Sequence, residues 1–122
     1  MNTYAQRIRP HVAAELRAAH NAERQGLAHR SFTHLERAHV LGQASTVQHV
    51  RVHLHMLSWA VKHRRPREAL GQVMRIVGAA TKTAVGWVPQ GNTGGSNVSP
   101  FKPMPIPPDL RATLEQARAR KH

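Results

Sequence analysis

Apolar residues recur at helical spacing through most of residues 1–85, and glycine or proline interrupts the pattern at short intervals. Residues three and four positions apart share one face of an α-helix, so such a pattern predicts helices that each bury one side. The interruptions divide the region into four predicted helices, over residues 11–25, 28–41, 46–63 and 66–77. We therefore expect an all-α fold of about four helices packed as antiparallel hairpins.

Local signals mark where these helices begin and end. Proline is tolerated in the first turn of a helix, glycine favours the position just past the last turn, and serine or threonine caps the start. The signals are Pro10 for the first helix, Gly26 and Gly42 at the ends of the first and second, Ser45 or Thr46 before the third, and Pro66 at the start of the fourth. The fourth helix carries the apolar residues Leu70, Val73, Met74 and Val77, and we expect it to fray at Gly78 on its way toward residue 85.

The two halves of this region resemble each other in organisation. Small or aliphatic residues follow the two inter-helix turns at equal spacing: Ser31 and Ala38 after Gly26, and Ala69 and Ile76 after Arg64. Small residues at such places let paired helices approach closely, as in tetratricopeptide-like hairpins. The spacing predicts a tetratricopeptide-like arrangement. Because aromatic residues make up only 4% of the chain, the core must be mainly aliphatic.

A change of composition separates the last part of the chain. Residues 86–108 are rich in proline and glycine, so no regular element is expected there. This stretch nevertheless contains apolar side chains, namely Trp87, Val88, Val98, Phe101, Met104 and Ile106. We expect an ordered, extended strap that lays them over the helical core of residues 1–85, followed by a short terminal helix over residues 109–121. With 122 residues, the chain has the size of one domain.

Positive charge dominates the composition. The chain has 18 Lys and Arg residues against 6 Asp and Glu, a formal net charge of +12, and such a field attracts polyanions. A nucleic-acid binder usually adds a clustered patch and aromatic residues for stacking, and here only His63, Arg64, Arg65 and Arg67 cluster. Nucleic-acid binding is therefore an alternative rather than the preferred function. A second alternative is a helical-repeat interaction module that binds a protein or acidic peptide through this basic cluster.

Cysteine is absent, which excludes disulfides, thiolate metal sites and cysteine nucleophiles. No apolar run approaches the length of a membrane span, and the first residues have no apolar signal region. We therefore expect a cytoplasmic protein with no membrane contact. No local pattern predicts a catalytic residue.

Histidine is the most unusual component, with ten in the chain. Glu36 and His39 fall on one side of the second predicted helix, while His49 and His53 lie on the same stripe of the third as Met56. The connection between these helices is short, so they are antiparallel neighbours, and the end of one lies near the start of the next. Four candidate ligands, Glu36, His39, His49 and His53, are therefore expected to converge, with His34 as a spare donor.

This donor set is typical of a metal site. Two imidazoles four residues apart can bind one metal from a single helix, and a Glu-x-x-His on a facing helix can add a carboxylate and a third nitrogen. Divalent zinc, nickel, cobalt, copper and iron all accept such ligands. We predict a transition-metal-binding accessory protein; an enzyme with a mononuclear two-histidine, one-carboxylate centre is also compatible with these residues. The competing interpretation is a set of hydrogen-bonded core histidines without a metal.

Several stretches together carry a family resemblance: HLERAH (34–39), LGQ (41–43), HVRVH (49–53), LGQ (70–72) and GNTGGSNVSPFKPMPIP (91–107). In these the chain resembles a bacterial family of domains of unknown function, number 3703 (DUF3703). The resemblance extends from about His11 to Leu110. It implies a compact helical cytoplasmic protein and, through an association with heavy-metal resistance genes, a link to metal handling. It implies no particular activity or ligand.

Overall fold

The computed structural model describes residues 3–80 and 104–119, with the side chains of all of these except 79 and 80. Over these ranges the chain forms five α-helices and no strand. They are α1 (Tyr4–Arg24), α2 (Ala28–Gly42), α3 (Thr46–Lys62), α4 (Pro66–Ala80) and α5 (Pro108–Ala119). The all-α prediction is confirmed.

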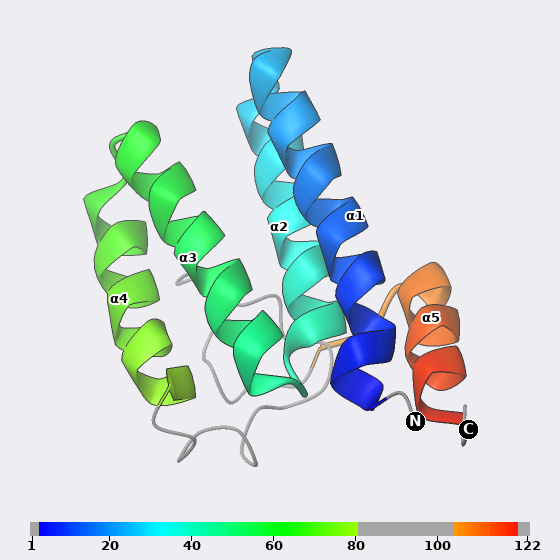
Figure 1. Cartoon of the computed structure of the whole chain (residues 1–122). Coiled ribbons are helices and arrows are strands. Elements are labelled where there is room, and N and C mark those ends of the chain that lie inside the picture. Colours follow the sequence, from blue (N-terminus) through cyan, green and yellow to red (C-terminus); the bar gives the residue numbers. More distant parts are fainter. Residues whose placement is uncertain (1–2, 81–103, 120–122) are drawn as a thin grey trace.

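The first four helices form two antiparallel hairpins, α1 with α2 and α3 with α4 (Figure 1). The hairpins meet along α2 and α3, and α5 packs beside α1 and α2. A closer likeness to tetratricopeptide repeats stays a prediction. Trp87, Val88, Val98 and Phe101 of the predicted strap lie outside the described residues. Of its remaining apolar side chains, Ile106 packs against the core.

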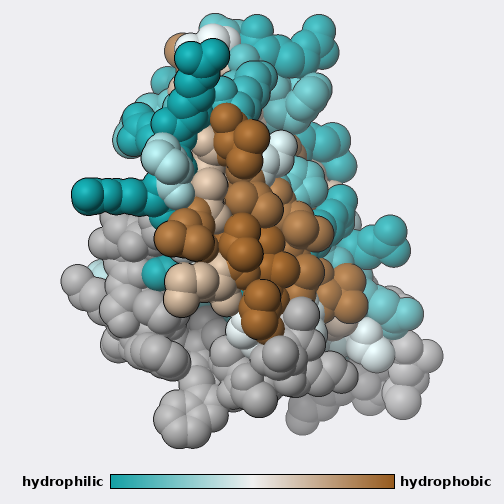
Figure 2. All heavy atoms as spheres, turned by 90° about the vertical axis from the view of Figure 1, so that its left-hand side faces the viewer, coloured by the Kyte–Doolittle hydropathy of each residue, from teal (hydrophilic) through white to brown (hydrophobic). Residues whose placement is uncertain are grey.

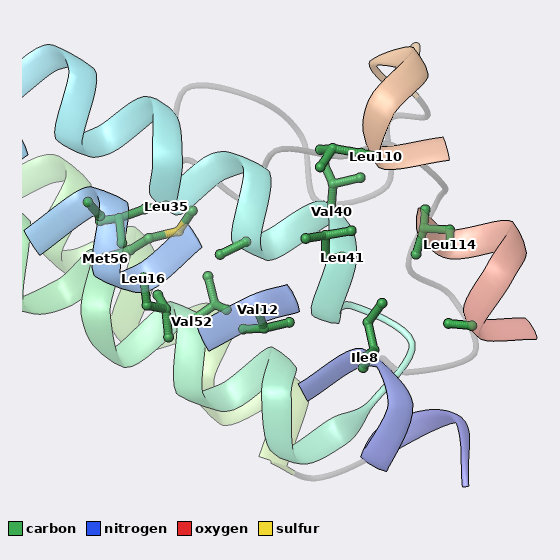
Figure 3. Close-up of a cluster of buried hydrophobic side chains, with 13 residues drawn as sticks. Ile8, Val12, Leu16, Leu35, Val40, Leu41, Val52, Met56, Leu110 and Leu114 are labelled. Atoms are coloured by element: carbon green, nitrogen blue, oxygen red, sulfur yellow. The ribbon is translucent and has the colours of Figure 1, made fainter. Parts of the chain in front are cut away.

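The core is aliphatic, as the composition predicts. Its buried side chains come from α1, α2, α3 and α5 and interdigitate where these helices meet (Figure 3). They are Ile8, Val12, Leu16, Ala19, Leu35, Ala38, Val40, Leu41, Val52, Met56, Leu110, Leu114 and Ala117. No helix in the described part of the chain is both long and apolar enough to cross a membrane.

The predicted start of the first helix is wrong: α1 begins at Tyr4 rather than His11. Thr3 and Gln6 form a capping box, in which each side chain accepts a hydrogen bond from the other residue's backbone N–H. Pro10 therefore lies inside the helix and not in its first turn. The helix continues past it because Ile8 and Val12, on either side, are fully buried in the core.

Gly42 does not occupy the predicted capping position just past the end of its helix. It is the last residue of α2, and the backbone stays right-handed at Gln43. A Cβ atom at Gly42 would lie 3.0 Å from Cβ of Gln48 and 3.4 Å from Cγ2 of Val12. The missing side chain therefore lets the end of α2 approach the start of α3 closely.

Two helices end in the same backbone motif. After α1, Leu27 N–H donates to the Ala22 carbonyl and Gly26, with φ of 77°, occupies the left-handed position. After α3, Arg65 N–H donates to the Ala60 carbonyl and Arg64 takes that position with φ of 56°. Both are Schellman motifs. The end of the first helix at Gly26 is therefore as predicted, whereas the second motif places a side chain where glycine is favoured.

Replacing Arg64 by glycine should stabilise the protein. An arginine in the left-handed region is strained, and glycine adopts that conformation without a steric penalty. We expect Arg64→Gly to raise the free energy of unfolding by about 1 kcal/mol. Urea denaturation measures this, and a decrease would show that the Arg64 side chain stabilises the turn by more than the strain costs.

The apolar residues of α4 lie on its solvent side. Leu70, Val73, Met74 and Val77 are all exposed, and Gln72, on the side that faces α3, has no exposed surface. The sequence predicts the helical spacing of this stripe correctly. The expected burial of the stripe is wrong, because α4 presents its polar side to the rest of the fold.

Candidate metal centre

Three histidines from two helices meet at the junction of the hairpins. His39 lies in the last turn of α2, and His49 and His53 lie on successive turns of α3. A turn closed by a hydrogen bond from Ser45 N–H to the Gly42 carbonyl links the helices, and Ser45 then caps α3. The end of α2 is thereby held against the first turns of α3.

The imidazoles of His39, His49 and His53 form a compact triad. One ligand nitrogen of each lies within 4.8 Å of those of the other two. All three side chains are buried, with 2%, 4% and 1% of their surface exposed. The predicted convergence of these three residues is confirmed, while the binding of a metal stays a prediction.

The rings are spaced as a tripod requires. Their centroids are 5.0 Å apart for His39 and His49, 4.7 Å for His39 and His53, and 4.8 Å for His49 and His53. Nitrogens about 2.1 Å from a tetrahedral ion would place the ring centroids about 5 Å apart. The rings are also tilted toward one another rather than stacked. To bind one tetrahedral ion, the nitrogens would have to move from within 4.8 Å to about 3.4 Å of one another.

A hydrogen-bonded relay from α4 orients His53. Glu68 Oε2 accepts from Gln72 Nε2 at 2.7 Å, and Gln72 Oε1 lies 2.5 Å from His53 Nδ1. A carboxylate is an acceptor, so the amide nitrogen of Gln72 must face it and the amide oxygen must face the imidazole. His53 therefore donates from Nδ1 and keeps a lone pair on Nε2. This is the tautomer that a metal-ligating histidine adopts when its second nitrogen is hydrogen-bonded.

Burial keeps His49 and His53 uncharged. Burial, together with the nearby His53, lowers the pKa of His49 to about 4. Burial also lowers the pKa of His53 to about 4, assisted by the charge of Arg75 and partly opposed by the Gln72 hydrogen bond and Glu68. Nδ1 of His49 is buried without a hydrogen-bond partner among the described residues. Both imidazoles are thus neutral at pH 7, the form that can ligate a metal.

The other predicted donors lie outside the triad. Glu36 is half-buried and, with Phe32 and Trp59, lines a pocket of about 500 Å³ between α2 and α3. It is not one of the described residues whose ligand atoms cluster with those of the triad. His34 pairs instead with Glu15, its Nδ1 lying 2.8 Å from the carboxylate. Its role as a spare donor is therefore not supported by its position.

The relay residues Gln72 and Glu68 were not predicted from the sequence. Glutamine has no characteristic spacing as a partner of a ligand, and the two residues lie on a helix with no predicted ligand. The only available signal is that Gln72 interrupts the apolar residues between Leu70 and Val73. That signal does not distinguish a buried amide from a surface one.

A family model matches most of the chain. No curated protein and no solved structure matches the chain significantly. A family model described as "Protein of unknown function (DUF3703)" matches residues 6–114, which include all of the triad and the relay. The chain therefore belongs to this family of proteins of unknown function, DUF3703.

Proposed function

We propose that the protein binds one divalent transition-metal ion through His39, His49 and His53, as an accessory protein that senses, buffers or transfers the metal. The observation that carries this proposal is the burial of three imidazoles with their ligand nitrogens within 4.8 Å of one another. Burying several imidazoles is costly unless their polar atoms find partners. A metal ion would supply such a partner to His49.

The donor set narrows the chemistry of the ion. Three neutral nitrogens, without a thiolate, suit divalent zinc, copper, nickel, cobalt or iron, whereas calcium and magnesium prefer oxygen ligands. Three histidines leave a fourth position of a tetrahedral ion for water or an exchangeable ligand. A position that takes an exchangeable ligand would suit a protein that receives and releases its metal.

Calorimetric titration of untagged, chelator-treated protein with zinc, copper(II), nickel and cobalt tests the proposal. We expect one ion per chain, with a dissociation constant below about 1 µM for at least one metal. Cobalt should also give the intense visible absorption of a tetrahedral complex. The double variant His49→Ala/His53→Ala should weaken binding by at least about 100-fold, since two of the three ligands are lost.

The matched control removes two histidines that are exposed, in the variant His20→Ala/His55→Ala. It should bind metal as the wild type does, which separates the triad from surface histidines. Circular dichroism checks that both variants fold. If the wild type binds no metal more tightly than about 1 µM, or if both double variants bind equally, the proposal is wrong.

Removing the relay should weaken the site without removing a ligand. In Gln72→Leu the buried Nδ1–H of His53 loses its acceptor, and loss of such a partner typically lowers metal affinity by about 10- to 100-fold. The double variant Glu68→Gln/Gln72→Glu, which keeps an acceptor for His53 Nδ1 and a donor–acceptor pair between residues 68 and 72, should recover the affinity. Zinc titrations measure both variants, and unfolding measured in parallel separates a loss of affinity from a loss of fold. Equal affinity in Gln72→Leu would show that the relay does not orient a ligand.

The variant Glu36→Gln decides between two ligand sets. The four-ligand hypothesis with Glu36 requires a loss of at least about tenfold in affinity when its charge is removed. We propose the three-histidine set, for which the affinity should stay within about twofold. Zinc titration gives the answer, and the cobalt spectrum reports whether the fourth ligand has changed.

A further inference from the structure

The outward face of α4 is an apolar stripe. Leu70, Val73, Met74 and Val77 follow the spacing of residues on one side of a helix. Their exposed fractions are 64%, 45%, 67% and 59%. Figure 2, which views the molecule from the α4 side of Figure 1, shows apolar side chains gathered in one continuous strip. Contiguous exposed apolar surface of this kind marks an interaction site.

The orientation of α4 makes the stripe unusual. An amphipathic helix normally buries its apolar side, yet α4 directs Glu68, Gln72 and half-buried Arg75 toward the fold. The relay to His53 needs Glu68 and Gln72 on the inner side. Since one side of α4 is committed to a buried polar network, its apolar side gains nothing from the chain's own core. A second molecule would bury it.

Charge at one end of the stripe indicates the kind of partner. Arg64, Arg65 and Arg67 are all exposed around the start of α4. Arg67 also lies three residues before Leu70 and seven before Met74, so it continues the apolar stripe on the same face. Glu68 is the only acidic residue of α4, and its carboxylate accepts a hydrogen bond from Gln72. It therefore adds no negative charge to the outward face. A partner surface complementary to this face would be apolar along most of its length and acidic at one end.

We propose that the outward face of α4 is a docking site for an amphipathic helix of another protein, with apolar residues at helical spacing and acidic residues at one end. The apolar residues of that helix would cover Leu70, Val73, Met74 and Val77. Its carboxylates would pair with Arg64 and Arg67, because the Arg65 guanidinium lies over the Trp59 ring, 5.7 Å from its centroid. Helix-in-groove and helix-on-helix recognition uses anchors of this spacing.

A second copy of this chain is a poorer fit. Three of the six acidic residues already contact basic side chains within the chain. Glu15 contacts His34 and Arg37, Glu23 contacts Lys62 and His63, and Asp109 contacts Arg37. Two molecules of net charge +12 also repel each other. A partner that brings its own carboxylates satisfies both the apolar stripe and the arginines.

An anionic membrane is also a poorer fit. Helices that lie on membranes usually carry Lys and Arg along the polar sides of their full length, with aromatic residues among the apolar ones. Among the described residues of α4 and the turn before it, the exposed basic residues gather at one end, and the stripe has no aromatic residue. This asymmetry favours a protein helix over a lipid surface.

The test uses the full chain and two synthetic peptides of about 18 residues, long enough for helix formation. One peptide has leucines at helical spacing and glutamates in one terminal half; in the other, lysines replace the glutamates. We expect the acidic peptide to bind with a dissociation constant of about 10 µM at low salt, and the basic one at least about tenfold more weakly. Fluorescence anisotropy measures both.

Substitutions locate the binding surface. Met74→Glu should weaken binding of the acidic peptide at least about tenfold, because it places charge in the middle of the stripe. Ala112→Glu on α5, on the far side of the molecule from α4 (Figure 1), adds the same charge at an exposed position and should change binding by less than about twofold. Failure of the acidic peptide to bind at about 1 mM, or equal loss in both variants, overturns the proposal.

Each of three further results would show that something other than a partner helix covers the stripe, and each would overturn the proposal. Sedimentation that shows a wild-type dimer and a monomeric Met74→Glu variant indicates a second copy. Flotation with phosphatidylserine vesicles that is lost in Met74→Glu indicates a membrane. A fall of more than about 1 kcal/mol in the free energy of unfolding of Met74→Glu indicates that the chain itself covers the stripe, because exposed substitutions change stability by about 0.5 kcal/mol or less.

Discussion

Acid should unfold the metal-free protein between about pH 6.5 and pH 4, an interval that begins above the pH at which carboxylates are protonated. The unfolded chain binds protons on His49 and His53 with the ordinary pKa near 6.5, whereas burial lowers the pKa of each to about 4 in the folded protein. Over this interval the unfolded state therefore binds more protons than the folded state. The free energy of unfolding falls as the pH falls, and above about pH 6.5 the two histidines contribute no pH dependence.

The expected loss is large for a domain of this size. Each histidine contributes about 3 kcal/mol between the two pKa values, at 1.36 kcal/mol for each pH unit. Small domains unfold with about 5 to 15 kcal/mol in total, so a loss of about 6 kcal/mol by pH 4 is a large part of the stability. Urea denaturation at a series of pH values, followed by circular dichroism, gives the slope directly.

Single substitutions assign that slope to the triad. His49→Leu replaces an imidazole by an apolar side chain of similar volume, and it should reduce the acid-induced loss by about half because one of the two groups is removed. The matched control, His55→Leu, changes an exposed histidine of the same helix and should leave the slope unchanged. A wild-type slope that survives in His49→Leu would mean that the acid sensitivity arises elsewhere.

A bound metal should oppose this acid transition. At a free metal concentration of about 100 times the dissociation constant, binding to the folded state alone adds about 2.7 kcal/mol. Ordinary imidazoles lose a metal below about pH 6 as they protonate. With pKa values of about 4, His49 and His53 compete less well for protons, so metal should be retained to a lower pH. A metal-dependent shift of the acid midpoint would link stability to the triad.

Local patterns were enough to predict the triad. His49 and His53 share a helical stripe with Met56, and a short turn between two helices allows few arrangements. Glu36 met the same criteria as His39, and yet it lies with Phe32 and Trp59 beside the pocket between the hairpins. A spacing of three residues places Glu36 and His39 on the same side of a helix. It does not predict over which part of that side the neighbouring helix packs.

Features set by tertiary packing could not be predicted in this way. Pro10 reads as the start of a helix, although burial of Ile8 and Val12 carries α1 past it. The stripe of α4 gives the same pattern whether it faces a core or a partner. Its orientation depends on Gln72, whose partner His53 lies 19 residues away in the chain. Such contacts have no signature within one helix.

Gly42→Leu should both destabilise the fold and weaken metal binding. Any Cβ atom at this position would lie 3.0 Å from Cβ of Gln48, and a leucine needs far more room than that. Overpacking of a buried contact typically costs about 1 to 3 kcal/mol, and we expect a loss of about 3 kcal/mol in the free energy of unfolding for this leucine. Because Gly42 follows His39 by less than one turn and Gln48 directly precedes His49, separation of these helices also spreads the ligands. We expect zinc affinity to fall at least about tenfold.

Gly26→Ala separates a loss of stability from a loss of ligand geometry. Nothing lies within 4 Å of a Cβ atom at Gly26, but its φ of 77° strains any side chain there. The variant should lose about 1 kcal/mol of stability through its backbone alone, far from the triad. Zinc titration and urea denaturation of both variants give four values. If Gly42→Leu keeps wild-type affinity, the close approach of α2 and α3 does not set the spacing of the imidazoles, and the proposed centre loses its structural basis.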